Sequence, residues 1–149
     1  MRSLFLLKTL CLFLLCPLLT FPAAAQDRFL DIETHQSPGG ISYWLVREDT
    51  LPIIAMAFSF ENSGAKHDSP DKQGLSILAT SMMNESAGPY ENETFLNLQN
   101  DNNISLSFNA GRDYIGGRLR MLSQYQDLAF DLLYYAVNEP RFDEAPLQR

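Results

Sequence analysis

The sequence predicts an α+β fold, in which an antiparallel or mixed sheet carries its helices on one face. Residues 41–46, 53–60 and 104–122 contain strand-length apolar runs with alternation, and residues 69–84 and 123–137 place apolar side chains at helical spacings of three and four. The length of 149 residues, with 46% hydrophobic and 19% charged, suits one ordinary globular domain at most. This mix excludes collagen-like, low-complexity and disordered chains.

The first 25 residues are expected to be a secretory signal peptide. Arg2 and Lys8 supply its positive charges, residues 9–21 form the apolar run, and three alanines supply a cleavage site, so cleavage is expected after Ala25. The run is short for a bilayer and Pro17 interrupts it, which disfavours the alternative of an uncleaved anchor. No stable membrane anchor is therefore expected after cleavage.

Charge and cysteine usage indicate the compartment. Cys11 and Cys16 are the only cysteines, and both lie in the predicted signal peptide, so the mature chain must hold its fold without disulfides. Export without disulfides favours a bacterial periplasm; glycosylation of the Asn-X-Ser/Thr triplets at Asn84, Asn92 and Asn103 would instead indicate a eukaryotic secretory route. The net charge of −7 and the lack of a basic stripe argue against nucleic acid as a partner.

Two strands are predicted at the start of the mature chain. Residues 26–40 form a polar lead-in that ends in a Pro-Gly-Gly turn, and the apolar residues of the strand 41–46 predict burial on both faces. The strand 53–60 has large side chains on one face and small ones on the other, and the small face leaves room for a helix to pack closely. The large residues are Ile54, Met56, Phe58 and Phe60, and the small ones are Ala55, Ala57 and Ser59.

Two helices are predicted next. Ser69 is expected to cap the first, with Pro70 at its first helical position and an end near Asn84. Pro89 then breaks the chain, and residues 91–99 predict a weaker helix.

A hairpin and a long helix follow. Residues 104–109 and 114–122 predict two paired strands with one solvent-facing side, and Gly116 with Gly117 suggests a bulge or a bend. The helix with the strongest apolar stripe follows, and Pro140 ends it. Its predicted capping box consists of Ser123 and Gln126. A further helix is expected to start within the last eight residues.

The sequence resembles the N-terminal domain of the M16 peptidases, the pitrilysin, insulinase and mitochondrial-processing-peptidase group. The segments that carry the resemblance read FSFENSGAKHDSPDKQGLSILATSMMNESAG, GRDY and PRFDEAPLQR. It covers residues 41–149, nearly the whole mature chain, and implies a metallopeptidase-like α/β roll. The domain organisation that follows is a signal peptide over 1–25, a lead-in over 26–40 and an M16 N-terminal-like domain over 41–149, incomplete at its C-terminus.

In that family the first long helix carries Gly-Leu-x-His-x-x-Glu-His-Met, in which two histidines bind zinc and the glutamate activates water. On this sequence the two histidine positions fall on Ile77 and Ser81, and the glutamate position falls on Thr80. Ile77 has no lone pair, and neutral hydroxyls are poor ligands and bases. The resemblance therefore implies no catalytic residues, no metal ligands and no cofactor in this chain, whereas active relatives hold zinc.

Other candidate site residues have plainer interpretations. His67, beside Asp68 and Asp71, could contact a metal at the surface, but a solvated loop histidine is favoured, and the same holds for His35 next to Glu33.

Two groups of charged residues lie in the predicted hairpin. Arg112 and Asp113 are expected to hold its turn, and Arg118 and Arg120 share a strand face that is solvated or ion-paired in preference to anchoring a substrate. The aromatic residues expected at the edge of the core are Tyr134 and Tyr135.

The resemblance implies an exported, non-catalytic subunit that forms chamber wall and binds peptide beside an active M16 subunit with an intact zinc motif. Two alternatives stay open: a stand-alone peptide-binding or truncated structural remnant, and a zinc metalloendopeptidase whose site is completed elsewhere. No peptidase activity is expected from the chain alone.

Overall fold

The computed structural model describes residues 30–148. The chain divides into two compact units, Met1–Arg47 and Glu48–Arg149. The predicted signal peptide and its cleavage site lie outside the described residues, and the predicted division at residues 26–40 and 41–149 stays a prediction. Among residues 30–148, no helix has the length and apolar character needed to cross a bilayer.

The described part of the first unit is a two-stranded antiparallel hairpin. Strand β1 (Ile32–Gln36) pairs with β2 (Ser42–Val46). The predicted lead-in thus contains strand β1, which its polar composition did not predict. The prediction that 41–46 is buried on both faces is wrong, because Trp44 is 80% exposed and a two-stranded hairpin has no second layer to cover it.

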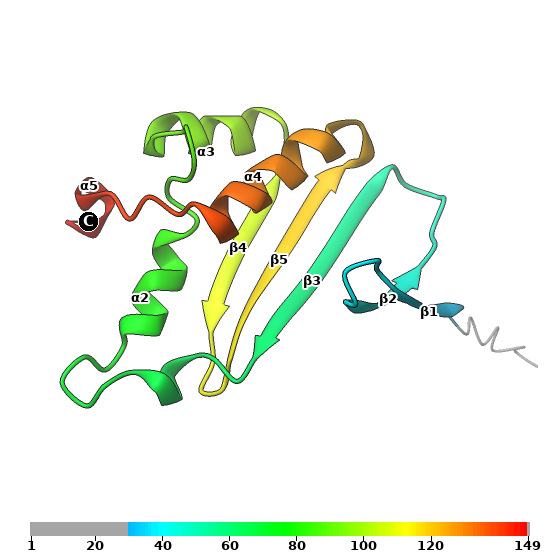
Figure 1. Ribbon diagram of the computed structural model, residues 1–149. Coiled ribbons are helices and arrows are strands. Elements are labelled where there is room, and N and C mark those ends of the chain that lie inside the picture. The colour runs from blue at the N-terminus through cyan, green and yellow to red at the C-terminus, as the bar shows by residue number, and fades with distance from the viewer. Residues whose placement is uncertain (1–29, 149) are drawn as a thin grey trace, which may run out of the picture. The chain divides into compact units, whose positions relative to one another are not determined.

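The second unit contains a three-stranded antiparallel sheet. Its strands are β3 (Ile53–Glu61), β4 (Ser105–Ala110) and β5 (Tyr114–Leu122), in the order β3, β5, β4. Strand β5 is therefore central, and β3 and β4 form the two edges (Figure 1).

The helices of this unit lie on one face of the sheet, as predicted (Figure 1). They are α2 (Leu75–Met82), α3 (Asn92–Asp101), α4 (Gln126–Asn138) and the short α5 (Glu144–Leu147). Two single 3₁₀ turns, η2 (Ala65–His67) and η3 (Ser123–Tyr125), precede α2 and α4. The α+β architecture predicted from the sequence is confirmed.

The core lies between the sheet and helices α3 and α4, and it uses the large face of β3. Ile54 and Met56 pack against a cluster of buried side chains, whereas the small residues on the other face of β3 are exposed. The prediction that a helix packs on the small face is wrong, because burying the large side chains removes more apolar area from water. The buried cluster consists of Ala87, Phe95, Ile104, Leu106, Leu119, Met121, Ala129, Leu132 and Ala136.

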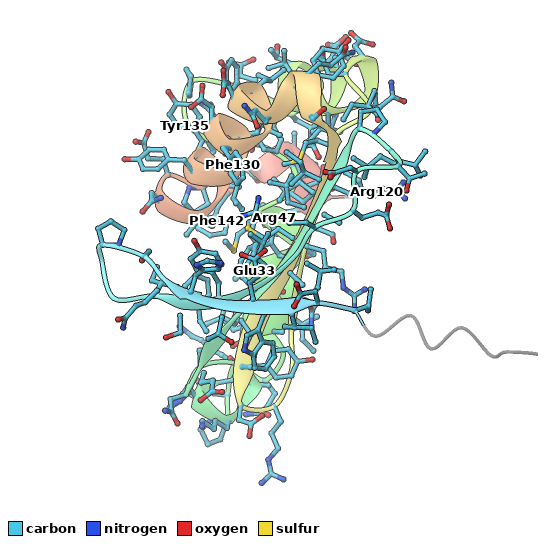
Figure 2. The ribbon with its side chains drawn as sticks, turned by 90° about the vertical axis from the view of Figure 1, so that its right-hand side faces the viewer. Glu33, Arg47, Arg120, Phe130, Tyr135 and Phe142 are labelled. Carbon is cyan, nitrogen blue, oxygen red and sulfur yellow. The ribbon has the colours of Figure 1, made fainter. Side chains whose placement is uncertain are left out.

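The outer face of the sheet is polar. Arg118 and Arg120 of β5 are exposed there, between Ala57 and Ala55 of β3 on one side and serines of β4 on the other. Figure 2 shows Arg120 on the opposite side of the sheet from Phe130 of α4. The hairpin β4–β5 therefore has one solvent-facing side, as predicted.

Two of the predicted helix starts differ from the structure. Residues 70–73 form turns and α2 begins only at Leu75, so Ser69 and Pro70 are not its cap and first residue. The cause is Asp68, whose carboxylate accepts hydrogen bonds from the backbone N–H groups of Gly74 and Ser76 at 3.0 and 3.1 Å. The carboxylate of Asp68 thus accepts hydrogen bonds from backbone N–H groups at the start of α2, although Asp68 precedes the predicted cap, Ser69.

The predicted capping box before α4 is also wrong. Ser123 starts the 3₁₀ turn η3, and the structure shows no side-chain cap on η3 or α4. The N–H of Ser123 instead donates to the carbonyl of Pro52, which fixes the corner between β5 and η3 against the start of β3.

The glycines of β5 form no bulge. The register between β3 and β5 runs without interruption through Gly116 and Gly117, which face Ser59 and Phe58. Gly117 is instead required by the aromatic ring that packs over it. Of the two predicted features, a bulge or a bend, the bulge is therefore wrong.

Candidate functional site

The three positions that the resemblance aligns with the M16 zinc motif lie on α2, the helix that packs beside the edge strand β4. Ile77 is 58% exposed, Ser81 is exposed and Thr80 is buried at 2% exposure. Positions 77 and 81 are one helical turn apart, so they share a face, whereas Thr80 points into the protein. The arrangement gives two surface positions and one core position.

The hydroxyl groups of this helix are used within the helix. Thr80 Oγ1 lies 2.9 Å from the carbonyl oxygen of Ser76 and 3.0 Å from that of Ile77, and Ser81 Oγ donates to the carbonyl of Leu78 at 2.8 Å. Such back-bonding is common for helical Ser and Thr residues. It leaves neither hydroxyl directed as a free donor toward a reactant.

These residues do not fit zinc. Zinc sites in proteins use imidazole, thiolate or carboxylate ligands, and the side chains at 77, 80 and 81 provide a hydrocarbon and two neutral hydroxyls. Within residues 30–148, no group of three or more His, Cys, Asp or Glu side chains lies close enough together to hold a metal ion. The helix therefore offers a shaped surface and no acid, base or metal ligand.

The structure gives Asp68 a structural role. Besides its two backbone partners, its carboxylate accepts a hydrogen bond from Ser76 Oγ at 2.6 Å. The hydrogen bond from this hydroxyl lowers the pKa of Asp68 below its usual 3.8, and the backbone N–H donors lower it to a smaller extent. His67 and Asp71 are exposed in the loop, and no hydrogen bond or ion pair joins either of them to Asp68 among the described residues.

A second polar cluster lies in the β1–β2 hairpin, within the first unit. Glu33 Oε1 accepts a hydrogen bond from Arg47 Nε (Figure 2). Its Oε2 lies 2.8 Å from His35 Nε2. The hydrogen bond from Arg47 lowers the pKa of Glu33, and the hydrogen bond from His35 lowers it to a smaller extent. His35 also stacks on Tyr43 at a centroid distance of 5.4 Å. Arg47 was missed in the sequence, since it pairs with Glu33 only across the hairpin.

The hairpin turn at Arg112 and Asp113 is held by its backbone. The carbonyl of Arg112 accepts a hydrogen bond from Lys66 N at 2.7 Å, and the carbonyl of Gly111 accepts one from Ala65 N at 3.0 Å. The expectation that the two charged side chains hold the turn is wrong, because the 3₁₀ turn η2 docks on its carbonyl groups.

The two tyrosines of α4 differ in exposure. Tyr135 is partly buried and lies over Gly88, where an added Cβ would come within 2.3 Å of its ring, while Tyr134 is 56% exposed. Core-edge placement therefore holds for Tyr135 and not for Tyr134.

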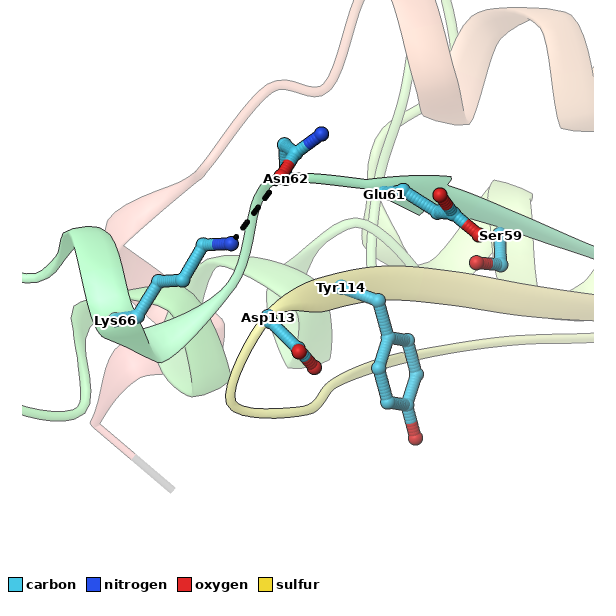
Figure 3. A pocket seen from close by; sticks show the side chains of 6 residues that line it. All are labelled: Ser59, Glu61, Asn62, Lys66, Asp113 and Tyr114. Carbon is cyan, nitrogen blue, oxygen red and sulfur yellow. Dashed lines mark hydrogen bonds between the residues drawn. The ribbon is translucent and has the colours of Figure 1, made fainter.

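A shallow polar cavity of about 330 Å³ lies where β3 ends beside the β4–β5 turn. Figure 3 shows Lys66 directed toward Asn62, with Nζ 3.4 Å from Oδ1, while the side chains of Asp113 and Tyr114 point another way. Ser59 and Glu61 complete the lining. Because these groups do not converge on one point, the cavity does not provide a reaction centre.

Comparison with known proteins identifies the fold. No family model matches the chain, and no curated protein matches it. A crystal structure described as a peptidase M16 inactive domain from Pseudomonas fluorescens matches with a TM-score of 0.69 and 21% sequence identity. The chain has an M16-like fold. The match covers 80% of this chain and 29% of the Pseudomonas chain, so the M16-like chain spans less than a third of that protein's length.

Proposed function

We propose that this chain is an exported, non-catalytic homologue of the insulinase-like M16 zinc peptidases, which binds peptide and forms chamber wall beside an active subunit. The proposal rests on helix α2, which carries Ile77, Thr80 and Ser81, the positions that the sequence resemblance aligns with the zinc ligands and the glutamate of the M16 motif. With both hydroxyls bonded to helix carbonyls, these positions cannot activate water, and the helix retains a packing role. In this proposal the predicted signal peptide directs the chain to a bacterial periplasm.

Peptide binding is proposed at the free edge of β4. An extended peptide can add a strand to an exposed sheet edge, and β4 is one of the two edges within the described residues. The hydrogen bond from Gly111 N to the carbonyl of Tyr114 fixes the alternation of the antiparallel ladder. By that alternation the backbone groups of Leu106, Phe108 and Ala110 point away from β5, where an incoming strand would pair with them.

The test is co-purification of the full chain from its native host, followed by metal analysis. The proposal expects a stable partner with an intact His-x-x-Glu-His motif, zinc that remains with the partner after the two are separated, and chelator-sensitive peptide hydrolysis by the complex alone. A monomer that binds peptide would favour the stand-alone remnant instead. Zinc at one ion per chain with hydrolysis by this chain alone would overturn the proposal.

A further inference from the structure

The outer face of the second unit's sheet carries two arginines that have no partner among the described residues. Arg118 and Arg120 are exposed on the central strand, and within residues 30–148 neither guanidinium forms a hydrogen bond or an ion pair. The chain has a net charge of −7, so its carboxylates outnumber its basic groups. The charge of this sheet face is therefore opposite in sign to the net charge of the chain.

The neighbours of these arginines leave them open on both sides. In the register of the sheet, Arg118 lies between Ala57 and Ser107, and Arg120 lies between Ala55 and Ser105. None of these four short side chains can cover a guanidinium or pair with its charge. Small residues therefore flank the two cationic groups on this face.

The acidic group on this face is distant. Glu61 belongs to the same face of β3, opposite Tyr114, and it stands four residues beyond Ala57, which is roughly 13 Å along a strand. At that separation an exposed charge is largely screened at physiological salt. At physiological salt Glu61 therefore neutralises neither guanidinium group.

From this arrangement we infer that the outer sheet face is a docking site for an extended acidic segment of a partner protein. Residues two apart on a strand lie about 7 Å apart on the same face. An extended segment with Asp or Glu at alternate positions therefore matches Arg118 and Arg120 in spacing, direction and charge. Each guanidinium can bind a carboxylate through two parallel hydrogen bonds.

This docking site is independent of the proposed M16-type role, because it lies on the sheet face opposite α2 and does not use the edge of β4. An acidic peptide is favoured over nucleic acid, since the net charge of −7 repels a long polyanion much more strongly than a segment with two carboxylates.

The experiment measures binding of three short peptides to the full chain by fluorescence anisotropy with an uncharged dye. The peptides alternate threonine with glutamate, glutamine or lysine. The inference expects the glutamate peptide to bind at least about tenfold more tightly than the glutamine peptide at about 0.01 M salt, and this preference to shrink at about 0.1 M, where the Debye length falls from about 30 Å to about 10 Å.

Variants locate the site. The double variant Arg118→Gln/Arg120→Gln should lose the preference for glutamate, while the control variant Lys72→Gln/Arg112→Gln, with the same net charge, should keep it. The charge-reversed Arg118→Glu/Arg120→Glu variant should prefer the lysine peptide, and its far-UV circular dichroism spectrum should match that of the wild type. Equal binding of the glutamate and glutamine peptides to the wild type, or equal losses in both double variants, would overturn the inference. Tighter binding of a single-stranded oligonucleotide through the same arginines would also overturn it.

Discussion

Phe58 of β3 lies directly across from Gly117 of β5, and its ring covers the glycine so closely that an added Cβ would come within 2.4 Å of Cζ. The ring also contacts Phe108 edge-to-face on the next strand, at a centroid distance of 6.0 Å. One aromatic side chain thus spans all three strands of the sheet, and the missing side chain at position 117 makes this possible.

Gly117→Ala is therefore expected to destabilise the second unit by about 1–3 kcal/mol, as overpacking of a filled site usually does. Urea denaturation followed by far-UV circular dichroism measures the loss. In the Phe58→Leu background the same substitution should cost clearly less, because the ring is gone. Equal losses in the two backgrounds would show that the backbone, rather than the ring, requires glycine at this position.

The carboxylate of Asp68 holds the start of α2, and its effect should depend on pH. Its pKa in the folded protein lies below the ordinary value of 3.8, chiefly because Ser76 donates a hydrogen bond to it. A lowered folded-state pKa stabilises the protein above the unfolded-state value, and this stabilisation is lost as the pH falls through the folded-state value.

Asp68→Asn should accordingly lower the melting temperature at neutral pH, and the difference from the wild type should close below about pH 3.8. Melting temperatures measured across this range test the point. Asp71→Asn is the control, because Asp71 is exposed in the same loop and makes no hydrogen bond among the described residues. A pH-independent difference for Asp68→Asn would exclude the carboxylate's charge as the cause.

The sequence predicted the class of the fold because local signals and burial agree over most of the chain. The apolar stripe of α4 and the alternation in β4 and β5 are periodic, and the core uses those residues. The predictions that were wrong concern features that depend on tertiary contacts. The cap of α2 comes from Asp68 across a turn, β1 needs β2 to form, and Gly117 is explained only by Phe58 on another strand.

For the candidate site, the resemblance predicted the three motif positions, and their residue types define their chemistry. The structure shows which of the three are exposed. Periodicity cannot tell that Thr80 faces the core while Ile77 and Ser81 face outward, because that depends on which side of α2 packs beside β4.

The exposed pair at positions 77 and 81 allows the proposed loss of metal binding to be tested by restoring two histidines. Ile77→His/Ser81→His places two imidazoles one turn apart on the same helix face, a spacing that can hold zinc. Zinc at about 100 times its dissociation constant should then stabilise the variant by about 2.7 kcal/mol, measured by thermal melting with and without chelator.

The matched control is Ile77→His/Leu78→His, which introduces two histidines at exposed but adjacent positions that do not share a face. It should gain no such stabilisation, and neither should the wild type. Zinc-dependent stabilisation of the wild type would mean that the unaltered chain has a metal site of its own.

The free edge of β4 can be tested at Ala110, whose N–H points away from β5 in the ladder. Ala110→Pro removes that donor, and loss of one main-chain hydrogen bond should weaken binding of a short threonine–valine reporter peptide about tenfold in fluorescence anisotropy. Ala110→Val keeps the donor in a residue suited to strands, so it should bind as the wild type does. Because β4 remains paired with β5 in both variants, their far-UV spectra should agree. Equal peptide affinities for two such folded variants would mean that the peptide binds elsewhere than at this edge.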